Sequence, residues 1–226
     1  MTSENLVTYI RRNRVSSTEV ADCLGKSGAL PDVVAVNRGH FRVGPVTWVY
    51  GYDESNWPIH EQIEDVPENS IVVVDDLGCG DRALFGDIVA KYLLLYKQAT
   101  AVVVTGKVRD VHRLIKEDWP IWCTGFSPVG CFNRKPTTEP DPALVAERQG
   151  YFHNAIAVCD DTGVVIIPKD QQDSGFMQKM EFIEEQEDIW YECIDRRKWS
   201  TYKTICEKAY LNGLPAKSPL SDDAQE

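Results

Sequence analysis

Two short segments of the chain carry residue types suited to holding a small organic acid. Gly86-Asp87-Ile88-Val89 is predicted to open a helix, where free backbone amides and the helix dipole favour a carboxylate. Arg109 offers a planar guanidinium that binds a carboxylate at two points, and Asp110 offers hard oxygens suited to Mg²⁺ or Mn²⁺. Together these groups would suit a 2-oxo acid, with its carboxylate on the amides and Arg109 and its keto oxygen on the metal.

The same spacing also permits a purely structural role. Asp110 would then cap a helix expected over residues 110–117, and Arg109 would form a surface ion pair. The spacing alone slightly favours this second interpretation.

Two nearby side chains stay outside the predicted site. Cys79 has no evident basic partner to make it a nucleophile, and Arg82 is left open between the anion site and a structural ion pair.

A glycine-rich turn precedes the first segment and invites a different function. Residues 76–80, DLGCG, follow an apolar strand as in methyltransferases that use S-adenosylmethionine. Such a turn needs a third glycine, and here Arg82 takes that place. It also needs an acid about 20 residues later to hold the ribose, and none follows at that distance. Both observations argue against a methyltransferase.

Two apolar strands must position the candidate residues. Residues 71–74 and 101–104 are continuous apolar runs joined by a helix expected over 85–98, which is typical of a parallel βαβ unit buried on both faces. The helix is apolar nearly all round, so we expect it to be buried on several sides. Because ligands bind beyond the carboxyl ends of such strands, the loops 75–87 and 105–110 should meet at one edge of the sheet.

The remaining pattern extends this α/β unit into a single domain over residues 1–217. A capping box at Ser16 and Glu19 begins a short helix, and Trp57-Pro58 opens another. The segment over residues 134–147 is polar. The other expected elements are a helix over 17–25, strands over 41–50 and 120–126, and a hairpin of 155–158 with 164–167.

The C-terminal part is expected to be a helical arm followed by a tail. A long amphipathic helix over 176–197 should turn Met180, Ile183, Trp190 and Ile194 inward. Residues 218–226 are polar and lack aromatic side chains, so this tail is predicted to be disordered.

Composition excludes several classes of function. The formal net charge of −11 argues against nucleic-acid binding, which needs a basic face. No apolar run is long enough to span a membrane, and the first residues do not resemble a signal peptide. The 7 cysteines form no CxxC pair, which favours free thiols in the cytoplasm over disulfides or zinc.

Four segments in this order resemble the RraA-like family, which includes the class II 4-hydroxy-4-methyl-2-oxoglutarate aldolases. They are VGPVTWV, RALFGDIVA, VVVTGKVRD and GVVIIP, and the resemblance covers residues 17–168. It implies a three-layer β/β/α sandwich of the swivelling phosphohistidine-domain type. It also implies a homotrimer or a homohexamer with active sites between subunits. The activity implied is aldol cleavage or decarboxylation of a small 2-oxo acid by a divalent-metal-dependent carbon–carbon lyase.

The resemblance also implies roles for individual residues. The amides of Gly86, Asp87, Ile88 and Val89 would bind the pyruvate part of the substrate, and Arg109 would contact it. Asp87 and Asp110 would hold Mg²⁺ or Mn²⁺, largely through waters. A neighbouring subunit would add a further acid, for which the candidates are Glu184, Glu185 and Glu187.

Three departures from the family pattern keep a non-catalytic alternative open. The segment between Asp87 and Arg109 is one residue longer than usual, Arg113 stands where an acid is frequent, and Thr105-Gly106 replaces Asp-Gly. These differences are compatible with a binding or regulatory protein on the same fold. Retention of Asp110 favours an enzyme, because the ribonuclease E inhibitor branch of the family lacks that aspartate.

Overall fold

The computed structural model describes residues 3–213. The chain divides into two compact units, Met1–Met180 and Glu181–Glu226, and the boundary falls inside helix α7 (Ser174–Asp195). The single domain expected over 1–217 therefore stays a prediction. The tail predicted to be disordered, 218–226, lies outside the described residues.

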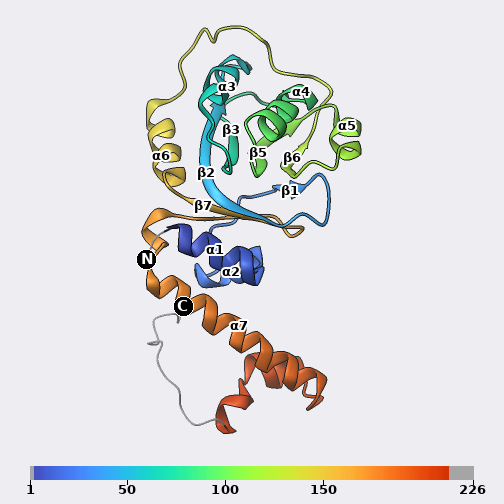
Figure 1. The fold of residues 1–226 in the computed structure, drawn as a ribbon, viewed down its shortest axis with the longest axis vertical. Helices are drawn as coiled ribbons and strands as arrows, with labels where there is room; N and C mark the ends of the chain where they lie inside the picture. Colours follow the sequence, from blue (N-terminus) through green and yellow to red (C-terminus); the bar gives the residue numbers. More distant parts are fainter. Residues whose placement is uncertain (1–2, 214–226) are drawn as a thin grey trace. The chain divides into compact units, whose positions relative to one another are not determined.

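A mixed sheet forms the centre of the first unit (Figure 1). Within the described residues its strand order is β1-β6-β5-β3-β2-β7-β8, and β4 pairs with β5 beside this path. Strands β2, β3, β5 and β6 run parallel, whereas β1, β7 and β8 are antiparallel to their neighbours. The bounds are β1 (Val34–Ala35), β2 (Arg42–Gly51), β3 (Ile71–Asp76), β4 (Ala83–Phe85), β5 (Ala101–Val108), β6 (Ile121–Phe126), β7 (Ile156–Cys159) and β8 (Val164–Ile167).

Strand β2 belongs to two layers at once. Its first part, from Arg42 to Pro45, pairs with β7, and its second part, from Val46 to Gly51, pairs with β3. The strand accordingly curves from one layer into the other in Figure 1. The result is a three-layer α/β arrangement, which confirms the predicted fold class.

The alternation of side chains along the central strands builds two separate cores. In β3, Val72 and Val74 face the helical layer, whereas Ile71 and Val73 face the layer of β7 and β8. All four are fully buried. A strand with helices on one face and a hairpin on the other must be apolar at every position, which explains the continuous apolar runs in the sequence.

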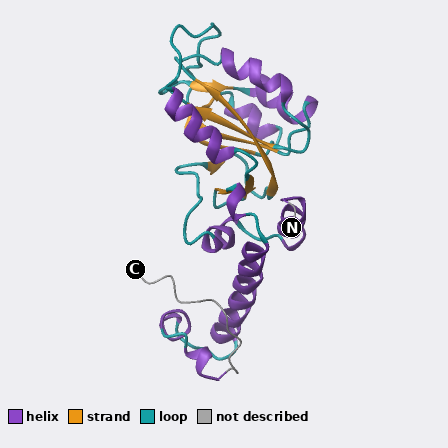
Figure 2. Cartoon of the chain, turned by 90° about the vertical axis from the view of Figure 1, so that its left-hand side faces the viewer, coloured by secondary structure: helices purple, strands orange, loops and turns teal. Residues whose placement is uncertain are grey.

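Helices cover the outer faces of this sheet, as the purple ribbons around the orange strands of Figure 2 show. The capping box at Ser16 and Glu19 forms as predicted, with both reciprocal hydrogen bonds present. The helices are α1 (Ser3–Asn13), α2 (Ser17–Cys23), α3 (Trp57–Gln62), α4 (Asp87–Lys91), α5 (Val111–Lys116) and α6 (Pro142–Phe152), with 3-10 turns η1 (Ile63–Asp65) and η3 (Lys169–Gln171) and a π-helical turn η2 (Tyr92–Tyr96).

The helix expected over 85–98 differs from the prediction in both extent and burial. Phe85 ends the short strand β4, Gly86 is the N-cap, and η2 continues α4 as a π-helical turn. One face packs on the sheet, but Ile88, Leu95 and Tyr96 are 77%, 55% and 71% exposed. The prediction that this helix is buried on several sides was therefore wrong for the single chain, because some of its apolar residues lie on the face exposed to solvent.

Two helices were not predicted. Helix α1 buries Leu6, Val7 and Ile10 along one stripe. Helix α6 begins within the segment 134–147, which the sequence showed only as polar, and only Phe152 of its residues is buried. The apolar residues of α6 do not recur with a helical period, although its cap signals, Asp141 followed by Pro142, are present.

The second unit contains the rest of α7, the π-helical turn η4 (Tyr202–Cys206) and the 3-10 turn η5 (Ala209–Gly213). The Tyr210 hydroxyl accepts hydrogen bonds at 3.2 Å from Trp190 Nε1 and from Gln186 Nε2. In α7, Ile183, Trp190 and Ile194 are only partly buried, whereas Met180, at the end of the first unit, is fully buried.

Candidate functional site

The carboxyl ends of β4 and β5 bring the two predicted segments together. Phe85 pairs with Val108 in a parallel register, and the Arg109 amide donates to the Phe85 carbonyl at 3.0 Å. Gly86 and Arg109 therefore leave neighbouring strands side by side. The sequence prediction that the two loops meet at one sheet edge is confirmed, although Phe85 belongs to a strand and not to a helix.

Asp110 does not cap α5 with its side chain. It is the N-cap residue but has a left-handed backbone, with φ of 56°, and its carboxylate makes no capping hydrogen bond among the described residues. The carboxylate instead approaches Gly86, where a Cβ atom would lie 2.0 Å from Asp110 Oδ2 and 2.9 Å from Arg109 Cγ. Position 86 is thus limited to glycine by space, because any side chain would displace both residues.

Four charged side chains of alternating sign form the centre of the site, and we call them the site quartet: Arg109, Asp110, Asp87 and Arg113. Arg113 Nη1 lies 2.7 Å from Asp87 Oδ2, and Arg109 Nε lies 3.6 Å from Asp110 Oδ2. The hydrogen bond from Arg113 holds the pKa of Asp87 below its ordinary value, with a smaller contribution from hydrogen bonding to Asp110. Asp110 Oδ2 lies against Gly86, the residue before Asp87, so both acids lie at the start of α4.

A third loop, residues 127–132, reaches the site from the carboxyl end of β6. A Cβ atom on Gly130 would lie 2.6 Å from Arg109 Nη1, so the guanidinium packs directly on this glycine. Arg82 Nη1 donates to the Gly130 carbonyl at 3.2 Å and lies over the Phe132 ring at 4.3 Å. Sequence reasoning missed Gly130, although it follows a parallel strand that ends at the same edge as β5.

These contacts favour the structural alternative for Arg82, and they agree with the exclusion of Cys79 as a nucleophile. Arg82 also pairs with Glu54 at 3.5 Å, so it holds the loop in place as part of a structural network. Cys79 is fully buried, and its hydrogen bond with Cys131 together with desolvation raises the pKa of its thiol. A buried neutral thiol is a poor nucleophile, in agreement with its exclusion from the predicted site.

The model of the family described as RraA-like, Aldolase/RraA, matches residues 17–166. The chain belongs to the RraA-like family. The matched segment contains the whole site quartet and the loop with Gly130.

Relatives of the RraA-like chain are distant. Protein DlpA of Legionella pneumophila is 26% identical over 171 residues, which is 74% of this chain but only 28% of that protein. A structure of an uncharacterised Pseudomonas syringae protein has a TM-score of 0.65 at 19% identity and covers 89% of this chain and 96% of its own. Streptomyces coelicolor RraAS2, described as an unusual member of the RNase ES inhibitor RraA family, has a TM-score of 0.61 at 21% identity and covers 83% and 94%. At these identities the structures show the fold alone.

The Thr105 departure from the RraA-like pattern has a structural explanation. Its hydroxyl hydrogen-bonds Asp75, and the Asp76 amide donates to the same oxygen at 3.0 Å. Asp75 is 2% exposed and also accepts from Arg148 at 2.7 and 3.0 Å and from Trp48 at 3.0 Å. Thr105 therefore completes a buried hydrogen-bond network that fastens β3, β5 and α6 together behind the site.

The donor set at the RraA-like site suits a divalent ion that keeps most of its waters. Asp87 and Asp110 place two hard carboxylates at the start of α4, and Mg²⁺ in proteins is usually held by one or two such acids. Over residues 3–213 no group of three or more His, Cys, Asp or Glu side chains could enclose a metal. The two carboxylates fit an ion whose remaining ligands are waters, substrate or another chain.

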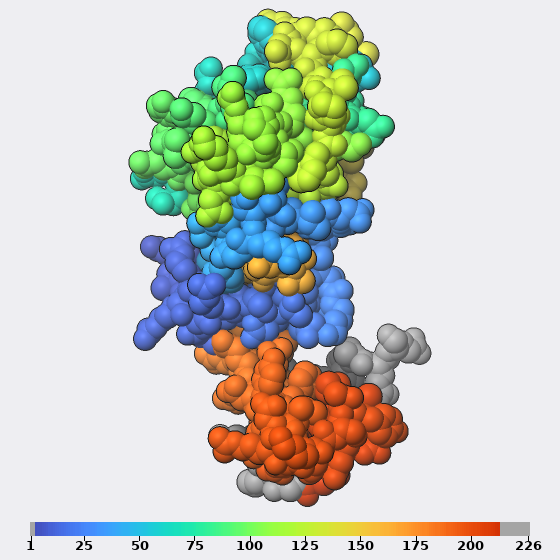
Figure 3. All heavy atoms as spheres, turned by 90° about the vertical axis from the view of Figure 1, so that its right-hand side faces the viewer, coloured from blue at the N-terminus to red at the C-terminus, as the bar shows by residue number. Residues whose placement is uncertain are grey.

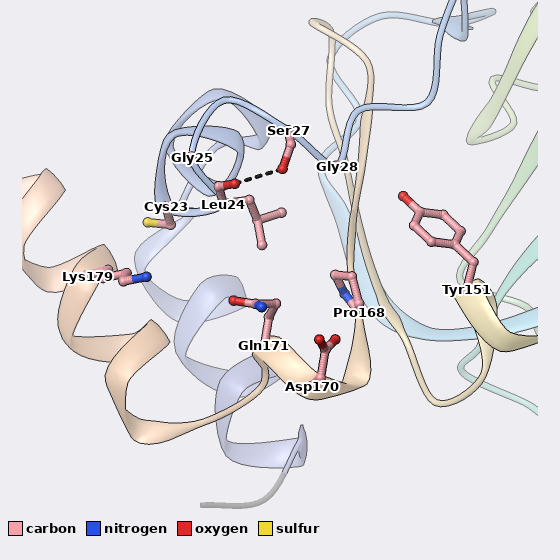
Figure 4. Close-up of a pocket in the computed structure, with 10 residues that line it drawn as sticks. All are labelled: Cys23, Leu24, Gly25, Ser27, Gly28, Tyr151, Pro168, Asp170, Gln171 and Lys179. Carbon is pink, nitrogen blue, oxygen red and sulfur yellow. Dashed lines mark hydrogen bonds between the residues drawn. The ribbon is translucent and has the colours of Figure 1, made fainter. Parts of the chain in front are cut away.

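A groove of about 470 Å³ lies elsewhere in the first unit, and Figure 4 shows its lining. Its charged groups are Asp170 and Lys179, and Ser27 donates to the Leu24 carbonyl within it. None of the quartet lines this groove, and the opposite charges of Asp170 and Lys179 do not select an anion.

Among the described helices none is long and apolar enough to cross a membrane.

Proposed function

We propose that this protein is a divalent-metal-dependent carbon–carbon lyase that acts on a small 2-oxo acid. The observation that carries the proposal is the convergence of Gly86, Arg109 and the carboxylates of Asp87 and Asp110 at one sheet edge. Two acids that could hold a cation, with the half-exposed guanidinium of Arg109 beside one of them, match the two ends of such a substrate. Membership of a family whose model is described as Aldolase/RraA supports it.

The chemistry assigned to the site follows from charge. Aldol cleavage or decarboxylation next to a keto group leaves an enolate, and Mg²⁺ or Mn²⁺ held by Asp87 and Asp110 would supply Lewis-acid stabilisation of that negative charge. Arg109 binds the substrate carboxylate, fixes its orientation and adds positive potential. The unblocked first turn of α4 offers the amides of residues 87–89 to the same carboxylate, because Gly86 has no side chain to cap them.

Assembly of subunits at the site is part of the proposal. Ile88 of α4 and Leu95 and Tyr96 of η2 are exposed apolar side chains in the helical segment that begins after Gly86, and Ile115 of α5 is 53% exposed. Figure 3 looks onto the side of the first unit where these helices lie, coloured green. Such residues support a homotrimer or homohexamer with sites between subunits. In it a neighbouring chain would supply the further acid, with Glu184, Glu185 and Glu187 of α7 as candidates.

The direct test is turnover by the purified protein. Oxaloacetate and a panel of 4-hydroxy-2-oxo acids are supplied with Mg²⁺ or Mn²⁺, and pyruvate release is followed with a coupled dehydrogenase. We expect turnover of at least one substrate that EDTA abolishes and added metal restores. Absence of pyruvate from every substrate with either metal would contradict the proposal.

A non-catalytic binding or regulatory role is the second candidate. The observation that favours it is the Arg113–Asp87 ion pair, which occupies one of the two metal-binding carboxylates. A stable protein partner recovered by affinity capture, together with absence of metal-dependent turnover, would establish this alternative.

A methyltransferase has less support, because Asp76 Oδ1 accepts from the Gly78 and Cys79 amides at 3.0 and 2.6 Å and so stabilises its own turn. Calorimetry with S-adenosylmethionine tests that function.

A further inference from the structure

Arg113 is the residue of the site quartet for which the proposed reaction has no use. It lies on the first turn of α5 and reaches Asp87, with its guanidinium 2.7 Å from the carboxylate. Its side chain is 63% exposed, whereas that of Asp87 is 17% exposed. The contact is therefore made by a long, exposed side chain on a largely buried acid, and the arginine can leave without disturbing the core.

The charges of the quartet explain why an arginine is held there. Asp87 and Asp110 bring two like charges to the start of α4, and such charges repel each other unless a cation lies between or beside them. Arg109 lies beside Asp110, and Arg113 lies on Asp87. The quartet is thus electrically neutral in the protein itself, with one arginine for each acid.

A divalent ion entering this quartet meets two obstacles. One carboxylate oxygen of Asp87 is already hydrogen-bonded, and a positive guanidinium lies within a few ångströms of the position the ion would take. From these contacts, and on the basis of the proposed function, we infer that Arg113 is a built-in competitor of the metal ion. Without metal, its positive charge balances the negative charge of Asp87. With metal, it lowers the affinity of Asp87 and Asp110 for the ion below the affinity that the two acids would have without Arg113.

This inference separates the roles of the two arginines. Arg109 packs on Gly130 and faces the substrate, so its loss weakens substrate binding. Arg113 contacts Asp87 and acts on the metal through that carboxylate, as a positioning residue. Removing its charge strengthens cation binding, because the repulsion disappears and an oxygen of Asp87 becomes available.

Metal binding itself, and not activity, provides the test. Mn²⁺ is titrated into the full-length wild-type protein and into Arg113→Gln, with free Mn²⁺ followed by electron paramagnetic resonance. We expect the Kd to fall about tenfold in Arg113→Gln, an order-of-magnitude estimate for removing one nearby, partly screened charge. Arg113→Lys keeps the charge, so its Kd should stay within about twofold of wild type.

Lys116→Gln is the matched control, because it makes the same charge change on the same exposed helix one turn further on. Its Kd should stay within about twofold of wild type, since it lacks the contact with Asp87. Unchanged or weaker Mn²⁺ binding in Arg113→Gln, or an equal gain in Lys116→Gln, would overturn the inference. So would failure of every variant to bind Mn²⁺.

The outcomes for the proposed function are separate. Loss of Mn²⁺ binding in Asp87→Asn/Asp110→Asn supports the metal site even where Arg113→Gln behaves as wild type. Failure of wild type and Arg113→Gln alike to bind Mn²⁺ would remove the metal from the proposed function as well. Melting temperatures of all variants confirm that each is folded, which the exposure of residue 113 leads us to expect.

Discussion

The carboxylate of Asp110 lies against Gly86 and does not cap helix α5. Substitution of Asp110 should therefore affect activity more than stability. Asp110→Asn keeps the size of the side chain and removes its negative charge. Because the carboxylate makes no capping hydrogen bond within the described residues, the melting temperature should hardly change. The turnover rate should fall about 10³-fold, which corresponds to roughly 4 kcal/mol of transition-state stabilisation.

The control for this change is Arg109→Lys, which keeps one charge and loses the two-point contact. Higher Mg²⁺ should partly restore Asp110→Asn and leave Arg109→Lys unaffected, since only the first variant is limited by metal. Melting temperature and steady-state rate are measured on the same preparations. Full activity in Asp110→Asn would rule out the metal assignment.

Gly130 is expected to set the position of Arg109. A methyl group at this residue would lie 2.6 Å from Arg109 Nη1, and a guanidinium on a flexible stem moves more readily than backbone. Gly130→Ala should therefore raise KM about tenfold, the size of one weakened charged contact, with little loss of stability. Titration of the rate against substrate concentration measures this.

Gly150→Ala serves as the comparison, because no described atom outside its own helix lies within 4 Å of the added methyl. An alanine in the last turn of α6 should stabilise the protein by up to about 0.5–1 kcal/mol and leave KM unchanged. Equal KM values for Gly130→Ala and wild type would show that the glycine does not control Arg109.

At the scale of elements, helix α6 is held to the sheet by one buried ion pair. Asp75 is 2% exposed and receives two hydrogen bonds from Arg148, whose pKa is raised chiefly by this carboxylate. Arg148→Met keeps the bulk over Phe152 and leaves Asp75 without its cation. The free energy of unfolding should fall by about 3 kcal/mol, as measured by urea denaturation.

A double-mutant cycle identifies the cause of that loss. Asp75→Asn combined with Arg148→Met removes both charges, so the double variant should be more stable than Arg148→Met alone. If the two substitutions lower stability additively, the carboxylate and the guanidinium are not coupled, and the loss would come from packing of the arginine on Phe152.

The elements that position the site could be predicted from the sequence because their signals are local. Continuous apolar runs identify β3 and β5, and the edge at which ligands bind follows from parallel pairing. Glycine at position 86 and the Arg109-Asp110 pair then fall at that edge. Helix α6 could not be found in this way, because it is fastened by a single arginine and one buried aromatic residue.

The fine geometry of the site depends on contacts that sequence spacing does not encode. The left-handed backbone of Asp110, the pairing of Arg113 with Asp87 and the packing of Arg109 on Gly130 all arise where three loops meet. Each loop comes from a different strand, so no local pattern specifies their mutual distances. The types of residue at the site could be predicted from the sequence, whereas the contacts that each side chain makes could be found only from the tertiary structure.

At the scale of the whole molecule, Leu95 tests the expected assembly. This residue of η2 is 55% exposed and belongs to the outward apolar face of α4 and η2. If subunits meet there, Leu95→Asp buries a charge in the interface and should convert the oligomer into monomers. Light scattering coupled to size-exclusion chromatography measures the mass of each. A monomeric wild-type protein would contradict the assembly itself.

The divided pairing of β2 has a consequence for the order in which the chain acquires its structure during synthesis. The second part of β2 finds β3 within a few tens of residues, but the first part waits for β7, roughly a hundred residues later, so closing that contact is entropically slow. A nascent chain would present Arg42–Pro45 as an open edge throughout this interval. Arg42 adds a charge and Pro45 removes a backbone donor, and both discourage pairing with another nascent chain before the native partner emerges.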